Sequence, residues 1–118
     1  MKLFVPVVGS ELKLLKGLKL GCTGIISATC NVTSYLARKV YEDFKRNKDQ
    51  TQNEKLCKIR KVFDKYDLIS GVHSFLSDLD PACKNILPPL TLLNAVEKNQ
   101  MLSDLQELEF SVNKLKIT

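Results

Sequence analysis

The amino-acid sequence predicts a parallel α/β fold. Two short apolar runs, residues 3–8 and 24–28, are each followed by a short polar segment and then by a helical pattern. We call the polar segment at the end of each run its tip. The repeated order of strand, tip and helix is typical of parallel α/β architectures. Because parallel barrels place their chemistry at the carboxyl ends of their strands, the tips at residues 9–11 and 29–31 are expected to face a site.

The first predicted strand and helix cover residues 3–21. Residues 3–8 form a continuous β-rich apolar run, which is typical of a buried strand, although Pro6 removes one hydrogen-bond donor to a neighbouring strand. Ser10 is positioned to cap a helix, and Gly21 to end it in the left-handed conformation that glycine tolerates best. One face of this helix is expected to carry Leu12, Leu15 and Leu18.

The second predicted strand, residues 24–28, leads into a helix that Thr33 can cap. Apolar residues then recur every fourth position and form one stripe, which is typical of a helix on the outer layer of the fold. The stripe consists of Leu36, Val40 and Phe44, and the charged residues Arg38, Lys39, Glu42 and Asp43 are expected to point elsewhere.

Three further helices are predicted in the rest of the chain. Thr51 and Glu54 have the spacing of a capping box before an amphipathic helix, and Asn94 and Glu97 have the same relationship before the last one. Between them, residues 68–79 continue a helical face until Asp80 and Pro81 stop it. The apolar faces carry Leu56, Ile59, Phe63 and Tyr66, then Leu68, Val72, Phe75, Leu76 and Leu79, and finally Leu102, Leu105 and Leu108.

The net charge of +5 raises the alternative of a nucleic-acid-binding protein. The lysines and arginines are spread along helical segments with apolar residues between them, which favours solvated helix faces. Few aromatic residues are present for stacking on bases. We therefore expect no nucleic-acid partner, with a basic helical nucleic-acid binder as the alternative.

Metal and membrane sites are not expected. The four cysteines lie far apart without a C-x-x-C pair, and His73 is the one histidine, so a zinc site is not predicted. No apolar run approaches the roughly 20 residues that a membrane-spanning helix needs, and no secretory signal is recognisable. A cytoplasmic protein with reduced thiols is the expectation.

The first half of the chain closely resembles the last two strands of a known enzyme family. The residues that carry the resemblance are Gly9-Ser10-Glu11, Gly21, Gly24-Ile25-Ile26-Ser27 and Asn31. They are similar to those of the dihydrodipicolinate synthase and N-acetylneuraminate lyase family, the class I pyruvate-dependent aldolases on a (β/α)8 TIM barrel. The similarity runs without gaps from Val7 to about Arg46 and more loosely through residues 87–90.

This resemblance implies that the chain is the C-terminal part of a barrel. A complete barrel of this kind needs about 250 residues, whereas the chain has 118. We expect a single unit over residues 1–118, an incomplete barrel. Residues 1–48 would supply the last two strands and their helices, and residues 49–118 a C-terminal helical segment.

The resemblance also implies four substrate-binding residues: Gly9, Glu11, Ile26 and Thr29. The main chain at Gly9 and Ile26 would lie against a pyruvyl group, and Glu11 would bind hydroxyl groups of a second substrate. From the residues alone, Gly9 and Ile26 are better explained as a tight turn and a core strand residue, whereas Glu11 fits an acidic residue in a first helical turn equally well. Ala28 stands where sialic acid lyases have a hydroxyl residue, so another 2-oxo acid is expected.

The catalytic lysine that would form a Schiff base is expected on a missing segment. No lysine falls inside a predicted strand, and Tyr35, Tyr41 and Tyr66 fall on helices. The resemblance implies no metal or organic cofactor, and as partners a 2-oxo acid, the missing barrel segment or another copy, and a homo-oligomer. Whether the chain itself is an enzyme is left open, and a noncatalytic interaction protein or a degenerate fragment of the barrel is the alternative.

Overall fold

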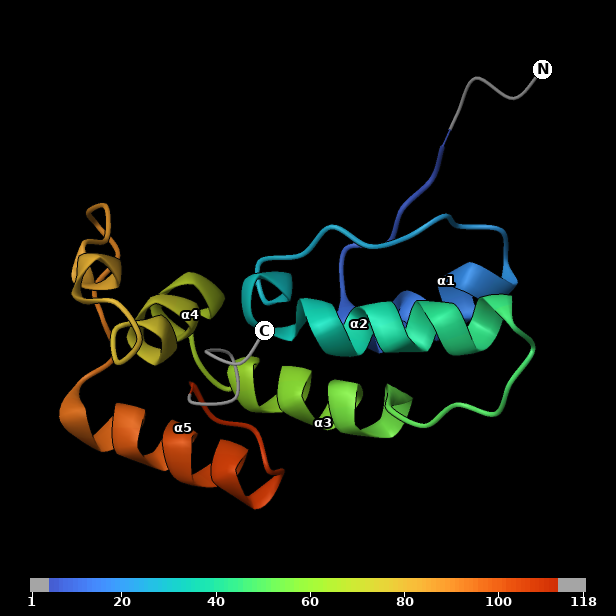
Figure 1. Ribbon diagram of the computed structural model, residues 1–118. Coiled ribbons are helices and arrows are strands. Elements are labelled where there is room, and N and C mark those ends of the chain that lie inside the picture. Colours follow the sequence, from blue (N-terminus) through green and yellow to red (C-terminus); the bar gives the residue numbers. More distant parts are fainter. Residues whose placement is uncertain (1–4, 113–118) are drawn as a thin grey trace. The chain divides into compact units, whose positions relative to one another are not determined.

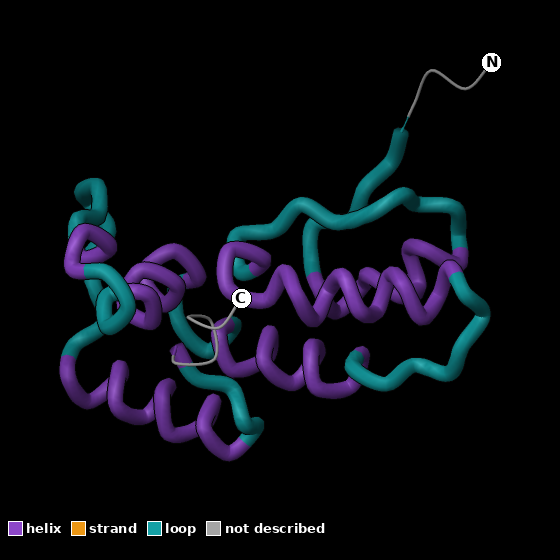
Figure 2. The backbone as a smooth tube through the Cα atoms, in the orientation of Figure 1, coloured by secondary structure: helices purple, strands orange, loops and turns teal. Residues whose placement is uncertain are grey.

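The computed structural model describes residues 5–112, which are mostly helical (Figures 1 and 2). They group into two compact units that divide between Arg60 and Lys61. This division differs from the predicted one at residues 48 and 49, because helix α3 contributes residues to both units. In chain order the elements are η1 (Glu11–Lys13), α1 (Leu14–Lys19), α2 (Cys30–Lys45), α3 (Asn53–Phe63), α4 (Leu68–Leu76), η2 (Pro81–Lys84) and α5 (Ala95–Glu107).

The two predicted strands are not formed within the described residues, and the first of them begins outside that part of the chain. One isolated parallel bridge, Val8 with Ile25, joins the two apolar runs. The amide of Val8 donates to Gly24 O at 3.0 Å, and the amide of Ile26 donates to Val8 O at 3.0 Å. No regular strand is formed in residues 5–8 or 24–28, although the two runs do pair in parallel.

The two apolar runs do not extend into regular strands because the described residues provide no further strand on either side of this bridge. Two short segments alone make too small a sheet to extend a regular ladder. Pro6 also lacks an amide donor. The two runs also stay uncovered, since Val5, Val7 and Ile26 are 66%, 44% and 75% exposed.

The segment η1 and helix α1 begin and end as predicted. Ser10 accepts a hydrogen bond from the Leu12 amide at 3.3 Å, and Gly21 has the left-handed φ of 101°. The predicted apolar face is correct at Leu18, which is buried, and wrong at Leu12, which is 40% exposed, while Leu14 is buried instead. The tighter 3-10 turn at the start of the segment rotates the side chains relative to an α-helix, which shifts the buried face.

Helix α1 packs on α2, and Gly17 allows a close approach between α1 and the bridge. A Cβ atom at Gly17 would overlap Val8 Cγ1 and contact the Cys22 side chain at 3.5 Å. A side chain at this position would therefore push the bridge away from the helix.

Helix α2 begins at Cys30, so the prediction that Thr33 caps it is wrong. Thr33 lies in the first turn and is completely buried. Asp43 is also buried, against the prediction, because it accepts hydrogen bonds from the Thr51 amide at 3.1 Å and the Thr51 hydroxyl at 2.9 Å. Thr51 thus binds Asp43, and α3 begins at Asn53, so the predicted cap at Thr51 lies one residue too early.

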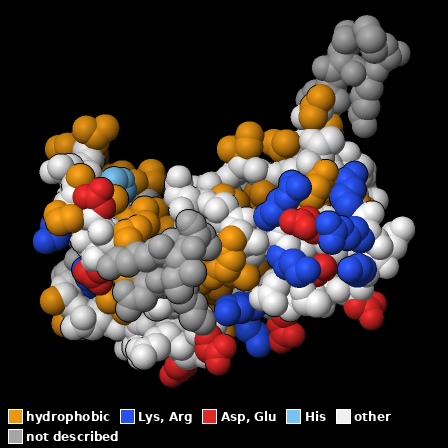
Figure 3. Space-filling view, viewed as in Figure 1, with side chains coloured by type: hydrophobic (Ala, Val, Ile, Leu, Met, Phe, Trp, Pro, Cys, Tyr) orange, Lys and Arg blue, Asp and Glu red, His pale blue; other side chains and the backbone are white. Residues whose placement is uncertain are grey.

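The solvent side of α2 is charged, as expected for a solvated helix face. Figure 3 shows Lys and Arg side chains interleaved with Asp and Glu over this helix. Glu42 pairs with Arg38 at 3.3 Å and with Arg46 at 3.6 Å. The positive charges of this face are therefore partly neutralised by neighbours one turn away.

The second unit contains α4, η2 and α5. Asp67 caps α4 by accepting from the Ser70 amide at 2.9 Å. The helix ends at Leu76, three residues before the predicted Leu79, and Asp80 then caps η2. The predicted capping box of Asn94 and Glu97 is confirmed, because each side chain accepts from the other's amide.

Aromatic rings form the core of the second unit. Phe75 contacts Phe63 edge to face, with ring centres 5.9 Å apart, and stacks on Phe110 at 5.3 Å. All three rings are buried, together with Met101 and Leu105 of α5. Throughout residues 5–112, none of the helices combines the length and the apolar character needed to cross a membrane.

Candidate functional site: a buried carboxylate at the strand tips

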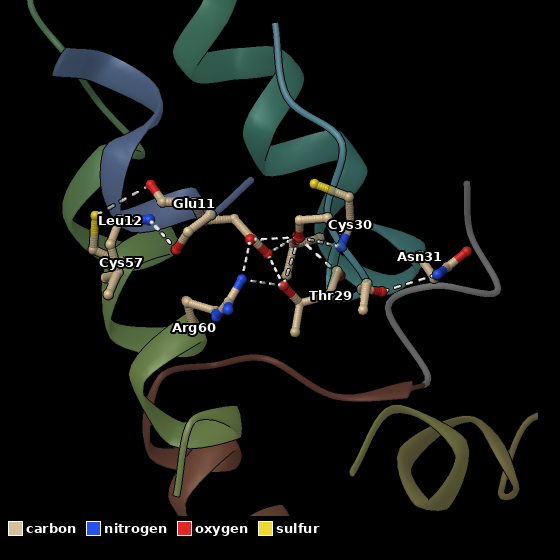
Figure 4. Close-up of polar contacts among 11 residues, drawn as sticks. Glu11, Leu12, Thr29, Cys30, Asn31, Cys57 and Arg60 are labelled. Atoms are coloured by element: carbon tan, nitrogen blue, oxygen red, sulfur yellow. Dashed lines mark hydrogen bonds and ion pairs between the residues drawn. The ribbon is translucent and has the colours of Figure 1, made fainter. Parts of the chain in front are cut away.

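The side chain of Glu11 is the centre of a buried polar network in the first unit (Figure 4). Its exposed fraction is 0%. Oε1 accepts from the Ser27 hydroxyl at 2.7 Å and from Arg60 Nη1 at 2.9 Å. Oε2 accepts from the Thr33 hydroxyl at 3.0 Å and, in a short hydrogen bond, from the Thr29 hydroxyl. Each carboxylate oxygen therefore receives two donors, which matches its two lone pairs.

Local structure brings these donors to Glu11 from three segments. The Ser10 cap sets Glu11 as the first residue of η1. Ser27 and Thr29 follow the bridge residue Ile25, and Thr33 lies one turn into α2. Arg60 reaches the carboxylate from α3, and its Nη1 also lies 3.3 Å from the Thr29 hydroxyl oxygen.

The carboxylate is held in its ionised form. Burial by itself raises the pKa of Glu11, but hydrogen bonds from Ser27, Thr29, the amide of Glu11 itself and Thr33 together outweigh it, so the pKa lies below its ordinary value of 4.5. The guanidinium of Arg60 acts in the same direction, because a nearby cation favours the charged form of an acid. At neutral pH the network therefore contains a buried ion pair.

The four predicted site residues fall into two groups. Glu11 and Thr29 are both completely buried and bonded to each other. Gly9 and Ile26 are exposed, and each follows one residue of the parallel bridge. Because the bridge is parallel, Gly9 and Ile26 leave it at the same end. A Cβ atom at Gly9 would meet nothing within 4 Å, so its main chain is open to approach.

Sequence reasoning missed three members of the network: Ser27, Thr33 and Arg60. A signal for Arg60 is present, because it lies four residues after Leu56 and three before Phe63, on the predicted apolar face of its helix. A cation at such a position usually has a buried acidic partner. The two hydroxyl residues carry no comparable signal.

A groove of about 330 Å3 lies elsewhere in the first unit, and none of the four predicted site residues lines it. It is lined in part by Ile25 of the bridge and by Cys30, Ser34 and Tyr41 of α2. Burial raises the pKa of the Cys30 thiol, which makes it a poor nucleophile. In the described part of the chain, no three His, Cys, Asp or Glu side chains gather where they could hold a metal ion.

A family model decides the relationship of this chain to known proteins. The model of the dihydrodipicolinate synthetase family matches residues 2–108. The chain belongs to this family. The resemblance noted in the strand tips is thereby confirmed, and it extends through the helices of the second unit.

A solved structure agrees with the family. The chain is similar to the crystal structure of dihydrodipicolinate synthase from Agrobacterium tumefaciens, with a TM-score of 0.71 and 18% sequence identity. The match covers 86% of this chain and 34% of that one, so the chain spans about a third of the length of the synthase. At this identity the likeness shows the fold of the matched part. No curated protein sequence matches the chain.

Proposed function

We propose that this chain supplies the C-terminal part of a class I aldolase that acts on pyruvate or another 2-oxo acid. Membership of the dihydrodipicolinate synthetase family supports the proposal. The observation that carries it is the parallel pairing of Val8 with Ile25, since Gly9 and Ile26 then leave the bridge at one common end. In a parallel barrel that end of the strands forms the site. The chain would represent the last two strands of a (β/α)8 barrel, with their helices.

Gly9 and Ile26 are the proposed contacts to the 2-oxo acid. The space around Gly9 lets its main chain approach a pyruvyl group, and Ile26 follows the other residue of the bridge. Glu11 and Thr29 are buried beside them, so direct contact of Glu11 with a second substrate would require one of its four donors to leave. We therefore propose that Glu11 and Thr29 hold Gly9 and Ile26 in position and do not contact the substrate themselves.

The Schiff-base lysine is proposed to lie outside residues 1–118. A class I aldolase needs a lysine whose pKa is lowered by burial or by neighbouring charges. Among residues 5–112, every lysine is exposed or half-buried. The exposed apolar residues Val5, Val7 and Ile26 would be covered by the rest of a barrel or by another copy of the chain.

The test is to trap the imine on the native protein. An antibody against the chain is used to isolate the protein from its natural source, and the protein is incubated with pyruvate and borohydride. Peptide mass spectrometry should find one reduced adduct on a lysine outside residues 1–118. Lactate, which lacks the reacting carbonyl group, is the matched control and should give no adduct.

Two results would contradict the proposal. An adduct on a lysine within residues 1–118 would show that the chain carries its own imine-forming group. A folded native protein without any adduct would favour the noncatalytic interaction protein, which is the alternative suggested by the sequence.

A further inference from the structure

The segment between the bridge and α2 has little structure of its own. Residues 26–29 are outside any helix or strand. At its start, the Ile26 amide donates to Val8 O at 3.0 Å. At its end, the Cys30 amide donates back to Ser27 O at 3.2 Å. Ala28 is exposed, as is Ile26. The side chains that hold the segment inward are therefore those of Ser27 and Thr29.

Both of those side chains are anchored on Glu11. Ser27 donates to one carboxylate oxygen of Glu11 and Thr29 donates to the other, so two residues of the segment are bonded to the same planar carboxylate. Ser27 and Thr29 also lie within hydrogen-bond distance of each other, with 2.9 Å between their hydroxyl oxygens. The position of the tip thus depends on where the carboxylate lies.

Arg60 fixes the carboxylate and the tip together. Its Nη1 lies 2.9 Å from Glu11 Oε1 and 3.3 Å from the Thr29 hydroxyl oxygen, and its side chain is 11% exposed. A carboxylate buried without a cation would favour protonation or movement toward water. The guanidinium of Arg60 prevents both, and its planar, rigid group limits the directions in which Glu11 can turn.

We infer that Arg60 is a positioning residue, which acts through Glu11 and Thr29 to hold the tip at residues 26–29 in the geometry that presents the Ile26 main chain to a 2-oxo acid. The part of this inference that concerns the 2-oxo acid rests on the proposed function. The part that concerns the tip rests on the described contacts alone. The two parts have separate readouts.

Amide hydrogen exchange of the isolated chain tests whether Arg60 stabilises the segment at residues 26–29. Arg60→Met keeps much of the side-chain length without the charge, and Arg60→Lys keeps the charge without the planar group. Arg38→Met is the matched control, because Arg38 pairs with Glu42 on the exposed face of α2. The reporters are the amides of Cys30, Asn31 and Val32, which donate to the carbonyls of residues 27–29.

In Arg60→Met these three amides should exchange roughly tenfold or more faster, because a hydrogen bond to a charged group is lost. Amides in the second half of α2 should accelerate by a smaller factor, set by the loss of global stability. The rates in Arg60→Lys should fall between those of Arg60→Met and the wild type, and Arg38→Met should match the wild type. Unchanged rates at the tip would overturn the inference. Equal acceleration throughout the first unit would also overturn it, since Arg60 would then support the whole unit. If Arg60→Met does not fold, the pattern in Arg60→Lys decides.

Imine trapping on the native protein tests the link to the substrate. Arg60→Lys should raise the pyruvate concentration for half-maximal trapping by roughly tenfold while leaving the amount trapped at saturation unchanged, and Arg38→Met should change neither. A purely stabilising role would lower the trapped amount without moving the pyruvate dependence, which would overturn the link. If the wild-type protein traps no pyruvate, the proposed function fails, whereas the exchange rates still decide the role of Arg60 at the tip.

Discussion

Arg60 Nη1 lies 2.9 Å from Glu11 Oε1, although 49 residues separate the two in the chain. The side chain of Glu11 is fully buried and that of Arg60 nearly so. Three hydroxyl groups complete the carboxylate's hydrogen bonds. A buried ion pair of this kind makes the first unit sensitive to the loss of Arg60, because the buried carboxylate of Glu11 would then lack the cation that faces it.

Loss of one partner should destabilise the chain strongly. Arg60→Met is expected to lower the free energy of unfolding by about 3 to 5 kcal/mol, because it leaves the Glu11 carboxylate buried without its cation. The double variant Glu11→Gln with Arg60→Met should recover part of this loss, since no buried charge remains. Urea unfolding measures both. Arg38→Met removes an exposed pair and should cost less than about 1 kcal/mol. Equal losses in the Arg60 and Arg38 variants would contradict the buried role of Glu11.

Acid should destabilise the chain through Glu11. The pKa of Glu11 is lower in the folded state than its ordinary value of 4.5. Its stabilising contribution is therefore complete above pH 4.5 and is lost as the pH falls from there through the folded pKa. Denaturation at a series of pH values should show this decline in the free energy of unfolding. The decline should be shallower in Glu11→Gln, and the part that remains should include Asp43, whose pKa is lowered mainly by the Thr51 hydroxyl. The same slope in both proteins would show that Glu11 does not titrate in this way.

Gly17→Ala should destabilise the chain although alanine favours a helix by about 1 kcal/mol over glycine. The added Cβ would overlap Val8 Cγ1, and forcing extra volume into a packed site costs about 1 to 3 kcal/mol. Shortening the facing side chain with Val8→Ala should rescue the Gly17→Ala variant. Gly24→Ala is the control, because a Cβ there would meet nothing within 4 Å. Thermal unfolding distinguishes these variants, and a stabilised Gly17→Ala would be the contrary result.

Gly9→Val should leave the stability of the chain nearly unchanged but weaken the binding of the proposed substrate. No atom within 4 Å opposes a Cβ at Gly9, so the free energy of unfolding of the isolated chain should change by less than about 0.5 kcal/mol. In the native protein, a branched side chain would intrude on the proposed pyruvyl position and reduce imine trapping with pyruvate and borohydride. Gly24→Val serves as the comparison. Trapping that is unaltered in Gly9→Val would remove this tip from the proposed site.

Signals between near neighbours in the sequence predicted the local structure well. The Ser10 cap, the left-handed Gly21 and the capping box of Asn94 and Glu97 each depend on residues a few positions apart, and all three are confirmed. The family resemblance came from a similarly compact set of residues at the two strand tips. Such features need no knowledge of distant partners.

The predictions that failed depended on distant partners. Thr33 and Thr51 both have the residue type of a helix cap, but their hydroxyls bind Glu11 and Asp43, which lie 22 and 8 residues away. The two apolar runs form one parallel bridge and no regular strand in the described residues, because a ladder requires neighbouring strands, which an apolar run does not specify. The position of Arg60 on an apolar helix face indicates a buried acidic partner, but the sequence does not identify Glu11 as that partner, because 49 residues separate the two.

The four donors around Glu11 also have a consequence for acid–base chemistry. A general base must have a free lone pair directed at the proton that it removes. Both lone pairs on each oxygen of Glu11 are already engaged, and its lowered pKa makes the carboxylate a weak proton acceptor. In any carbon–carbon bond cleavage at this edge, the proton would have to pass to another group. Protonation of Glu11 would then change the reaction rate by disturbing the structure of residues 26–29, and not because Glu11 transfers a proton.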